Sequence, residues 1–249
     1  MSKKITVLYY HEVVPAGQGY TYQKIEQEKF ASQMRWLKEH GYETLTFSQL
    51  SEPLPEKPVI ITFDDGFRSV YTYAAPILEA CGFRAVLFLA PKYIDQNHSY
   101  YLTWEQVREL IGRGMVEAGA HTYSHIDVRS VSDAQLQEEI EACDNSIYSN
   151  LGIRPRAFCF PYGTFRRSAV KTLRRSGYWY LVASFFGRTR IGRMKRCLIQ
   201  RIGISDTDSM EMFIRKVTGK ESYRGIIQLA RILRDNLRKK WVTEYRIDF

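Results

Sequence analysis

Two short polar clusters in this sequence have the residue types and spacing to bind a metal ion. The first is the pair Asp64-Asp65, which precedes Gly66, and the second contains His121 and His125, four residues apart. Carboxylate oxygens and imidazole nitrogens bind zinc and similar divalent ions, and two histidines with this spacing can bind one ion together. Two imidazoles and one carboxylate leave coordination positions for water and substrate, which is typical of a catalytic metal site.

Adjacent carboxylates at the end of a buried strand repel each other and lose solvation, so a cation or a nearby base must compensate. If Asp65 binds the ion, Asp64 is placed to accept a proton from water. Asp-Gly is also a common turn pair, so a simple turn or helix cap is the alternative. A third cluster, Pro161-Tyr162-Gly163, predicts a sharp turn that can point a backbone N–H into a site, although an ordinary turn fits it equally well.

The elements that position these clusters are apolar runs that alternate with helical patterns. The predicted strands cover 5–10, 58–63, 85–89, 115–120, 157–160, 180–184 and 199–202, and helices are predicted at 26–40, before Gly82, at 103–113, 132–148 and 168–176. This alternation predicts an α/β fold with a parallel sheet, open or closed into a barrel, whose chemistry sits at the carboxyl ends of the strands. Each polar cluster directly follows a strand, so we expect the clusters to converge on one rim.

Composition limits the class of protein. A hydrophobic content of 45% and an aromatic content of 14% are typical of a globular chain. No apolar run approaches the roughly 18 residues that span a bilayer, and the run Ile5–Tyr10 is too short for a signal peptide. We therefore expect a cytoplasmic protein whose four cysteines are reduced thiols. Without a linker or repeat, residues 1–249 are predicted to form a single domain with a basic helical segment at about 206–249.

Charge is distributed unevenly along the chain. Residues 1–144 carry a net charge of −7, residues 145–249 carry +16, and no acidic residue occurs between Asp144 and Asp206. This asymmetry indicates either a polyanionic partner or a solvated basic face. No nucleic-acid motif accompanies it, so nucleic acid ranks last among the partners. A stripe that includes Ile226, Leu229 and Leu233 either docks on the barrel or lies on an anionic membrane, which would place the protein at the inner membrane face.

Three motifs in order resemble those of the polysaccharide deacetylase family, also called the NodB homology domain or carbohydrate esterase family 4. Thr62-Phe63-Asp64-Asp65-Gly66 is similar to the first motif and His121-Thr122-Tyr123-Ser124-His125 to the second. Pro161-Tyr162-Gly163 is similar to the end of the third. The resemblance spans roughly residues 5–205.

The resemblance implies a distorted (β/α) barrel of about seven parallel strands and a hydrolase acting on carbon–nitrogen bonds other than peptide bonds. It implies that Asp65, His121 and His125 bind a divalent metal, most readily Zn²⁺, with Co²⁺, Mn²⁺ or Ni²⁺ as alternatives. With Asp64 as general base, metal-bound water would attack the N-acetyl group of an amino sugar in a glycan or glycoconjugate. The metal and the backbone N–H of Tyr162 would stabilise the oxyanion.

Two positions depart from the family pattern. Cys159 stands where the third motif often has an arginine that orients the base, and no histidine follows His125 to act as the family's late general acid. Arg201 lies near that late position and can stabilise charge, but it cannot give up a proton. We therefore expect His11 or a protonated Asp64 to supply the proton, and a hydrogen bond within the core is the equally weighted alternative for His11. The alternatives are a glycan-binding homologue with impaired turnover, or an amidase or deformylase acting on a small or lipid-linked N-acyl sugar.

Overall fold

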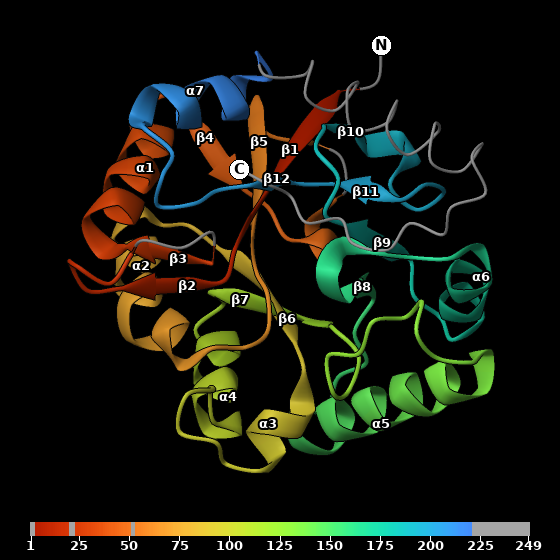
Figure 1. Cartoon of the computed structure of the whole chain (residues 1–249). Helices are drawn as coiled ribbons and strands as arrows, with labels where there is room; N and C mark the ends of the chain where they lie inside the picture. Colours follow the sequence, from red (N-terminus) through yellow and green to blue (C-terminus); the bar gives the residue numbers. More distant parts are fainter. Residues whose placement is uncertain (1–2, 20–22, 51–52, 221–249) are drawn as a thin grey trace.

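The computed structural model describes residues 3–19, 23–50 and 53–220 and contains one large sheet and one small one. Strand order in the large sheet is β10-β1-β5-β6-β7-β8-β9-β11, with β12 also pairing with β1 and β4 with β5 (Figure 1). Its strands are β1 (Lys4–Tyr10), β4 (Tyr42–Thr44), β5 (Lys57–Phe63), β6 (Ala85–Leu89), β7 (Val116–Ala120), β8 (Ala157–Cys159), β9 (Tyr180–Ala183), β10 (Thr189–Arg190), β11 (Ile199–Gln200) and β12 (Ile202–Gly203). The small sheet pairs β2 (Glu12–Val14) with β3 (Lys24–Glu26).

A single extended segment closes the large sheet into a barrel. β11 pairs in parallel with β9, and β12 pairs in parallel with β1 at the opposite edge of the sheet. Only Arg201 separates β11 from β12, so the segment 199–203 serves as one closing strand. The ring therefore contains seven parallel strand positions, and the predicted distorted (β/α) barrel of about seven strands is confirmed.

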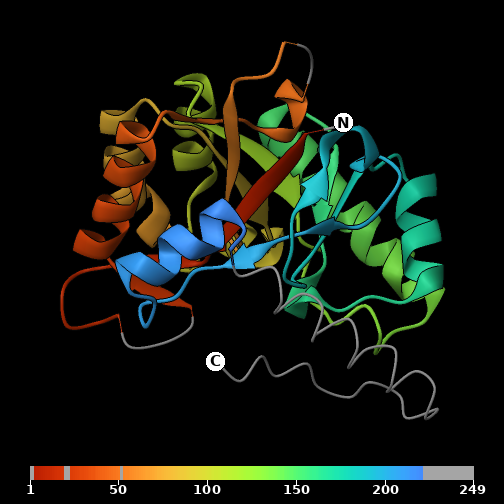
Figure 2. The same cartoon turned by 90° about the horizontal axis from the view of Figure 1, so that it is seen from above.

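Helices surround this ring on the outside (Figure 2). Two of them begin at the capping boxes that the sequence predicted, Thr103 with Gln106 and Ser132 with Gln135. The helices are α1 (Gln27–Glu39), α2 (Ala75–Cys81, directly after a π-helical turn at Val70–Ala74), α3 (Pro91–Asp95), α4 (Trp104–Gly112), α5 (Asp133–Leu151), α6 (Arg167–Arg175) and α7 (Met210–Thr218). Among the helices of these described residues, none is long and apolar enough to cross a lipid bilayer.

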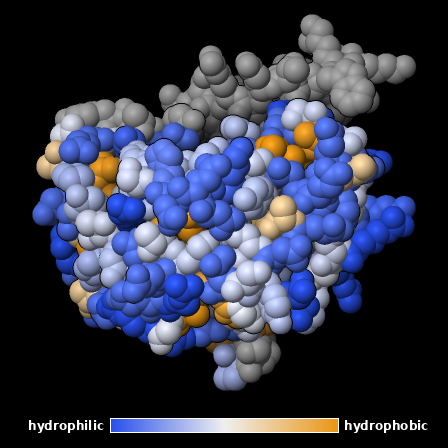
Figure 3. Space-filling view, turned by 90° about the horizontal axis from the view of Figure 1, so that it is seen from below, coloured by the Kyte–Doolittle hydropathy of each residue, from blue (hydrophilic) through white to orange (hydrophobic). Residues whose placement is uncertain are grey.

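The barrel strands are buried on both faces, which is why they appear in the sequence as continuous apolar runs. On β1, Ile5 and Val7 pack inside the barrel with Val182 and Ile199, whereas Leu8 packs outward against the helical layer. The outer surface is mostly polar, and in the view from below its hydrophobic residues form separate small patches (Figure 3). The apolar core thus fixes the positions of the strand ends, and polar residues occupy the rim that these ends form.

The predicted basic segment at about 206–249 is described only as far as residue 220. Within that part, α7 buries Phe213 and Val217 against the barrel, so this portion docks on the fold. The candidate helix at 224–246 lies outside the described residues. The sequence did not predict β2, β3, β4, β10 or α3, since these short segments mix polar and apolar residues and lack the continuous apolar runs of the core strands.

Candidate active site

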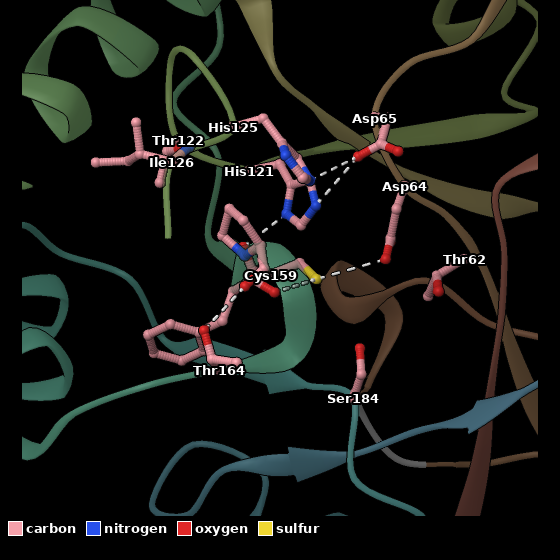
Figure 4. Close-up of polar contacts among 12 residues, drawn as sticks. Thr62, Asp64, Asp65, His121, Thr122, His125, Ile126, Cys159, Thr164 and Ser184 are labelled. Carbon is pink, nitrogen blue, oxygen red and sulfur yellow. Dashed lines mark hydrogen bonds and ion pairs between the residues drawn. The ribbon is translucent and has the colours of Figure 1, made fainter. Parts of the chain in front are cut away.

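The two candidate metal-binding clusters converge at the carboxyl ends of β5 and β7, the two strands that flank β6 in the sheet. Asp65 follows β5, and His121 follows β7. The Asp65 Oδ1 atom lies 3.4 Å from His121 Nε2 and 3.1 Å from His125 Nε2. Figure 4 shows both imidazoles pointing at the Asp65 carboxylate. The structure thus brings together the three residues that the sequence selected as metal ligands.

The backbone around these residues is held in sparsely populated conformations. Four of the five described non-glycine residues with positive φ are Asp65 (74°), Thr122 (57°), His125 (58°) and Tyr162 (58°). Such strain persists only where surrounding contacts impose it, and it concentrates at functional sites. Here the Thr122 hydroxyl accepts the Ile126 N–H at 3.1 Å, which is one of the contacts that impose the loop's shape.

The trio fits a divalent metal on its own chemistry. Asp65 Oδ1 is buried and accepts no hydrogen bond, although two imidazole nitrogens lie beside it. A bound cation would satisfy this buried oxygen. His121 Nδ1 lies 2.7 Å from the Cys159 carbonyl oxygen, and donating to it leaves Nε2 with a lone pair for a metal. Burial tends to raise the pKa of Asp65, but the two nearby imidazoles outweigh burial and hold it well below its usual value. An ionised carboxylate and two nitrogens suit zinc and similar ions.

Asp64 lies deeper in the barrel and is held by Arg201. The Arg201 guanidinium donates to both Asp64 oxygens, with Nη1···Oδ1 at 2.7 Å and Nη2···Oδ2 at 2.8 Å. Arg201 is 1% exposed, so the pair is shielded from water. Burial tends to raise the pKa of Asp64, but the charge and hydrogen bonds of Arg201 more than offset it and lower that pKa. Asp64 is therefore an ionised carboxylate in a fixed orientation.

Arg201 contacts the residue that stands at the family's arginine position. Its Nη2 atom lies 3.0 Å from Cys159 Sγ, and the Cys159 thiol lies 3.8 Å from Asp64 Oδ2. The carboxylate thus meets an arginine here as well, but one that comes from the closing strand instead of β8. Arg201 thus takes the place of the arginine missing at position 159, although it comes from a different part of the sequence.

Two further hydroxyls hold Arg201 in place. Thr62 belongs to the first motif but had no predicted role, and Ser184 was not among the predicted site residues. Arg201 Nη1 donates to Thr62 Oγ1 at 3.1 Å, and Nη2 donates to Ser184 Oγ at 2.8 Å. The guanidinium also lies over the Tyr9 ring, 4.5 Å from its centroid. Ser184 directly follows β9, and a polar residue at a strand's carboxyl end is the signal that could have found it.

The turn at Pro161–Gly163 packs against this network through Gly163. A Cβ atom added at Gly163 would lie 2.4 Å from Ser184 Cβ, so only glycine allows this close approach. Tyr162, at the centre of the turn, is exposed, and its ring lies edge-on to His125 with the centroids 4.7 Å apart. The turn therefore borders the metal-binding trio on one side and the Arg201 network on the other.

His11 follows β1 at the same rim. Its ring makes no hydrogen bond within the described part of the chain and contacts Tyr9 edge-on, at a centroid separation of 5.9 Å. Burial lowers the pKa of His11, and the negative charges of Asp64 and Asp65 partly counter this effect. His11 is thus a partly buried imidazole within electrostatic range of both carboxylates. All seven residues that the sequence selected lie at this rim or directly beneath it.

The sequence is similar to proteins of one known family. A family model described as "Polysaccharide deacetylase" matches residues 51–181. YxkH of Bacillus subtilis (strain 168), to which the same family name is given, is 30% identical over 182 residues, which cover 70% of this chain and 62% of YxkH. The poly-beta-1,6-N-acetyl-D-glucosamine N-deacetylase of Escherichia coli (strain K12) is 26% identical over 254 residues, covering 84% of this chain and 38% of that protein. The chain therefore spans less than two thirds of either relative.

Solved structures share the fold. The Streptococcus pyogenes deacetylase PplD in complex with acetate matches 87% of this chain and 99% of its own, with a TM-score of 0.79 and 21% identity. A de-N-acetylase from Aggregatibacter actinomycetemcomitans matches 86% of this chain and all of its own, with a TM-score of 0.77 and 24% identity. At these identities the likeness establishes the barrel fold.

Proposed function

Because the chain belongs to the polysaccharide deacetylase family, we propose that it is a metal-dependent hydrolase that removes the N-acetyl group from an amino sugar of a glycan. The observation that carries the proposal is the adjacency of two differently held carboxylates. Asp65 faces two imidazoles that can share a metal ion with it, while Asp64 is paired with Arg201 and stays available as a base. A site that only binds glycan through a metal does not need the second carboxylate.

The metal-binding residues in this proposal are Asp65, His121 and His125, and Zn²⁺ is the ion that we expect. When bound, a divalent ion of this kind lowers the pKa of a coordinated water and polarises an acyl oxygen. The carbonyl of Cys159 supports the arrangement by fixing the ring of His121. Since the donor set is compatible with Co²⁺, Mn²⁺ and Ni²⁺ as well, metal content after purification decides the identity.

Asp64 is the proposed general base. Its carboxylate takes a proton from the attacking water, and the new carbon–oxygen bond forms at the acetyl carbon. Arg201 acts through Asp64 as a positioning residue, because its two parallel hydrogen bonds fix the carboxylate plane. The turn at Pro161–Gly163 would present the Tyr162 N–H to the developing oxyanion.

His11 is the proposed proton donor to the leaving nitrogen. Burial lowers its pKa, whereas the nearby charges of Asp64 and Asp65 favour the protonated ring that this role requires. When the carbon–nitrogen bond breaks, the amine of the sugar must gain a proton, and acetate leaves. Among the described residues, His11 is the third imidazole at this rim, beside His121 and His125. No other described side chain forms a hydrogen bond with its ring. A protonated Asp64 is the alternative donor, since it holds the proton taken from water.

A substrate panel tests the proposed activity. We propose poly-β-1,6-linked N-acetylglucosamine as the first substrate, because the Escherichia coli relative is named for that polymer. Chitin oligosaccharides, peptidoglycan fragments and nucleotide-linked N-acetyl sugars complete the panel, and acetate release is measured before chelation, after it and after metal is restored. We expect metal-dependent release from at least one glycan. Glycan binding without release from any member would favour the impaired, glycan-binding alternative.

Location and membrane contact are separate proposals. We propose that the protein acts in the cytoplasm, peripheral to the inner membrane face. The support is compositional: the chain carries a net charge of +9, and the cytoplasmic leaflet of a membrane is anionic. Fractionation of cells that produce the full-length protein tests this, and recovery from outside the cytoplasmic membrane would contradict it.

A further inference from the structure

A basic surface that includes an exposed tryptophan lies at the amino ends of three neighbouring strands. Arg156 directly precedes β8, Trp179 directly precedes β9, and the turn that carries Arg193, Lys195 and Arg196 precedes β11. Since these strands are parallel, their amino ends share one edge of the barrel. We call these five residues the amino-rim patch. The metal-binding trio and Asp64 lie at the other end, after the strands.

Contacts among the loops make the patch one surface. The Trp179 ring is contacted by two cations, with Lys195 Nζ at 4.4 Å and Arg156 Cζ at 4.5 Å from its centroid. Arg174, at the end of α6, donates to the carbonyl oxygen of Trp179 and also to that of Cys197, the latter at 3.5 Å. Arg174 therefore links the loop before β9 to the loop before β11.

The charge of the patch is not neutralised within the described residues. Arg156, Arg193, Lys195 and Arg196 are all exposed, and none of them forms an ion pair with an acidic side chain in the part of the chain described. Glu117, the carboxylate that acts electrostatically on neighbouring Tyr180, is engaged by two hydrogen bonds from Ser48. Four cations thus face solvent around a tryptophan that is 46% exposed.

We propose that the amino-rim patch binds the anionic headgroup surface of a lipid bilayer. Tryptophan is enriched at the depth of the headgroups, and each nearby Lys or Arg strengthens attraction to an anionic leaflet by about fivefold. Stacking of Trp179 on a nucleobase or a sugar would displace the cations that already contact its ring. At a headgroup surface, the Trp179 ring and the cations beside it can instead contact the same layer of anionic headgroups.

This docking has a consequence for the active site. With the amino rim on the bilayer, the rim that carries Asp65 and His121 faces away from the lipid. A membrane-bound molecule would then reach glycans that extend from the membrane or lie in solution, and not sugars linked to lipids at the same surface. This consequence rests on the proposed function, whereas the docking itself does not.

Vesicle co-flotation with the full-length chain tests the docking. The probes are vesicles of phosphatidylcholine alone and vesicles with roughly one third phosphatidylglycerol. We expect the wild type to bind the anionic vesicles preferentially and to release as salt is raised. The variant Arg193→Glu/Lys195→Glu/Arg196→Glu should bind at least about 100-fold more weakly, from about fivefold for each lost cation. Trp179→Ala should weaken binding several-fold.

A matched variant separates this patch from net charge. Arg35→Glu/Arg108→Glu/Arg167→Glu changes the total charge by the same amount at exposed positions on α1, on α4 and at the start of α6. It should bind anionic vesicles within a few-fold of wild type. The proposal is overturned if the wild type prefers neither vesicle, if both triple variants lose binding equally, or if the patch retains only a soluble polyanion such as heparin or DNA. Unfolding midpoints near that of the wild type exclude misfolding, and neither assay depends on deacetylase activity.

Discussion

The proposed metal-binding half and the proposed base half of the candidate site are assembled in different ways. His121 and His125 lie in one short loop, and Asp65 joins them from the end of a nearby strand. In contrast, Asp64 is held by Arg201, which is 137 residues away in sequence. The first half depends on local spacing, whereas the second depends on how the barrel closes. The comparison teaches that a supporting residue can move to another strand if its side chain reaches the same buried point.

The strongest way to separate the two halves is Asp64→Asn. This change keeps the shape of the side chain and removes the proton acceptor, so acetate release should fall roughly 10²–10⁴-fold, the usual range for a general base. Metal content should stay at the wild-type level because Asp65, His121 and His125 are intact. Metal analysis of both proteins beside the rate checks this. A parallel loss of metal would mean that the halves are one unit.

His11→Gln probes the donor that completes the base half. Glutamine can donate a hydrogen bond but cannot transfer a proton at neutral pH, so turnover should fall roughly 100-fold with little change in metal content. Substrates with an activated leaving group, which need less protonation, should recover most of the rate. Equal turnover in the variant and the wild type would remove His11 as donor and favour Asp64 in both roles.

Arg201→Met tests the pairing through pH dependence. Without the guanidinium, Asp64 loses the strongest influence that lowers its pKa, while burial still raises it, so the acidic limb of kcat/KM should move to higher pH. Arg201→Lys keeps a positive charge and should move that limb less. An acidic limb at the wild-type position in Arg201→Met would show that Arg201 does not set the ionisation of the base.

The same pair should be visible in stability. In the wild type, the lowered pKa of Asp64 stabilises the fold above the usual carboxyl pKa, and this contribution is lost as pH falls through the folded-state value. Leaving the buried Asp64 without its partner should lower the free energy of unfolding by about 3–5 kcal/mol at neutral pH. Urea unfolding of Arg201→Met at neutral and acidic pH measures the difference, which should shrink in acid.

Ser184→Ala is the mildest probe of the base half. It removes one hydrogen bond to Arg201 Nη2 and leaves the two bonds to Asp64, so we expect a loss of about 1 kcal/mol of stability and a fall in kcat of up to about tenfold. Ser184→Thr retains the hydroxyl and should restore kcat if its methyl group fits beside Gly163. A decrease confined to stability, with kcat and its pH profile unchanged, would limit Ser184 to a structural role.

Local signals explain what the sequence could predict. The buried parallel strands are continuous apolar runs that end at polar clusters, so the parallel α/β sheet and the convergence of Asp65, His121 and His125 follow from short stretches of sequence. Closure of the sheet into a barrel was implied by the family resemblance. Ser132 with Gln135 fixed the start of α5 in the same way. The pairing of Arg201 with Asp64 had no such signal, because it depends on where the closing strand 199–203 enters the barrel.

Backbone strain was also beyond the sequence. Positive φ at Thr122 and Tyr162 is imposed by tertiary contacts on residues that do not favour it, so no local preference indicates it. Gly163 carries a partial signal, since glycine after a strand suggests a turn. Its close approach to Ser184 appears only once β8 and β9 are neighbours. The sequence therefore predicted the candidate metal-binding residues better than the contacts that hold the site in shape.

The most direct test of the central claim is a metal titration of the metal-free wild type in which occupancy and acetate release are measured on the same samples. If Asp65, His121 and His125 hold the ion that supports deacetylation, release from the responsive glycan should rise in proportion to occupancy and reach its plateau at one ion per chain. Asp65→Ala should bind far less metal and release little acetate at the same concentrations. Full release from metal-free protein, or release in Asp65→Ala that matches the wild type, would contradict the account.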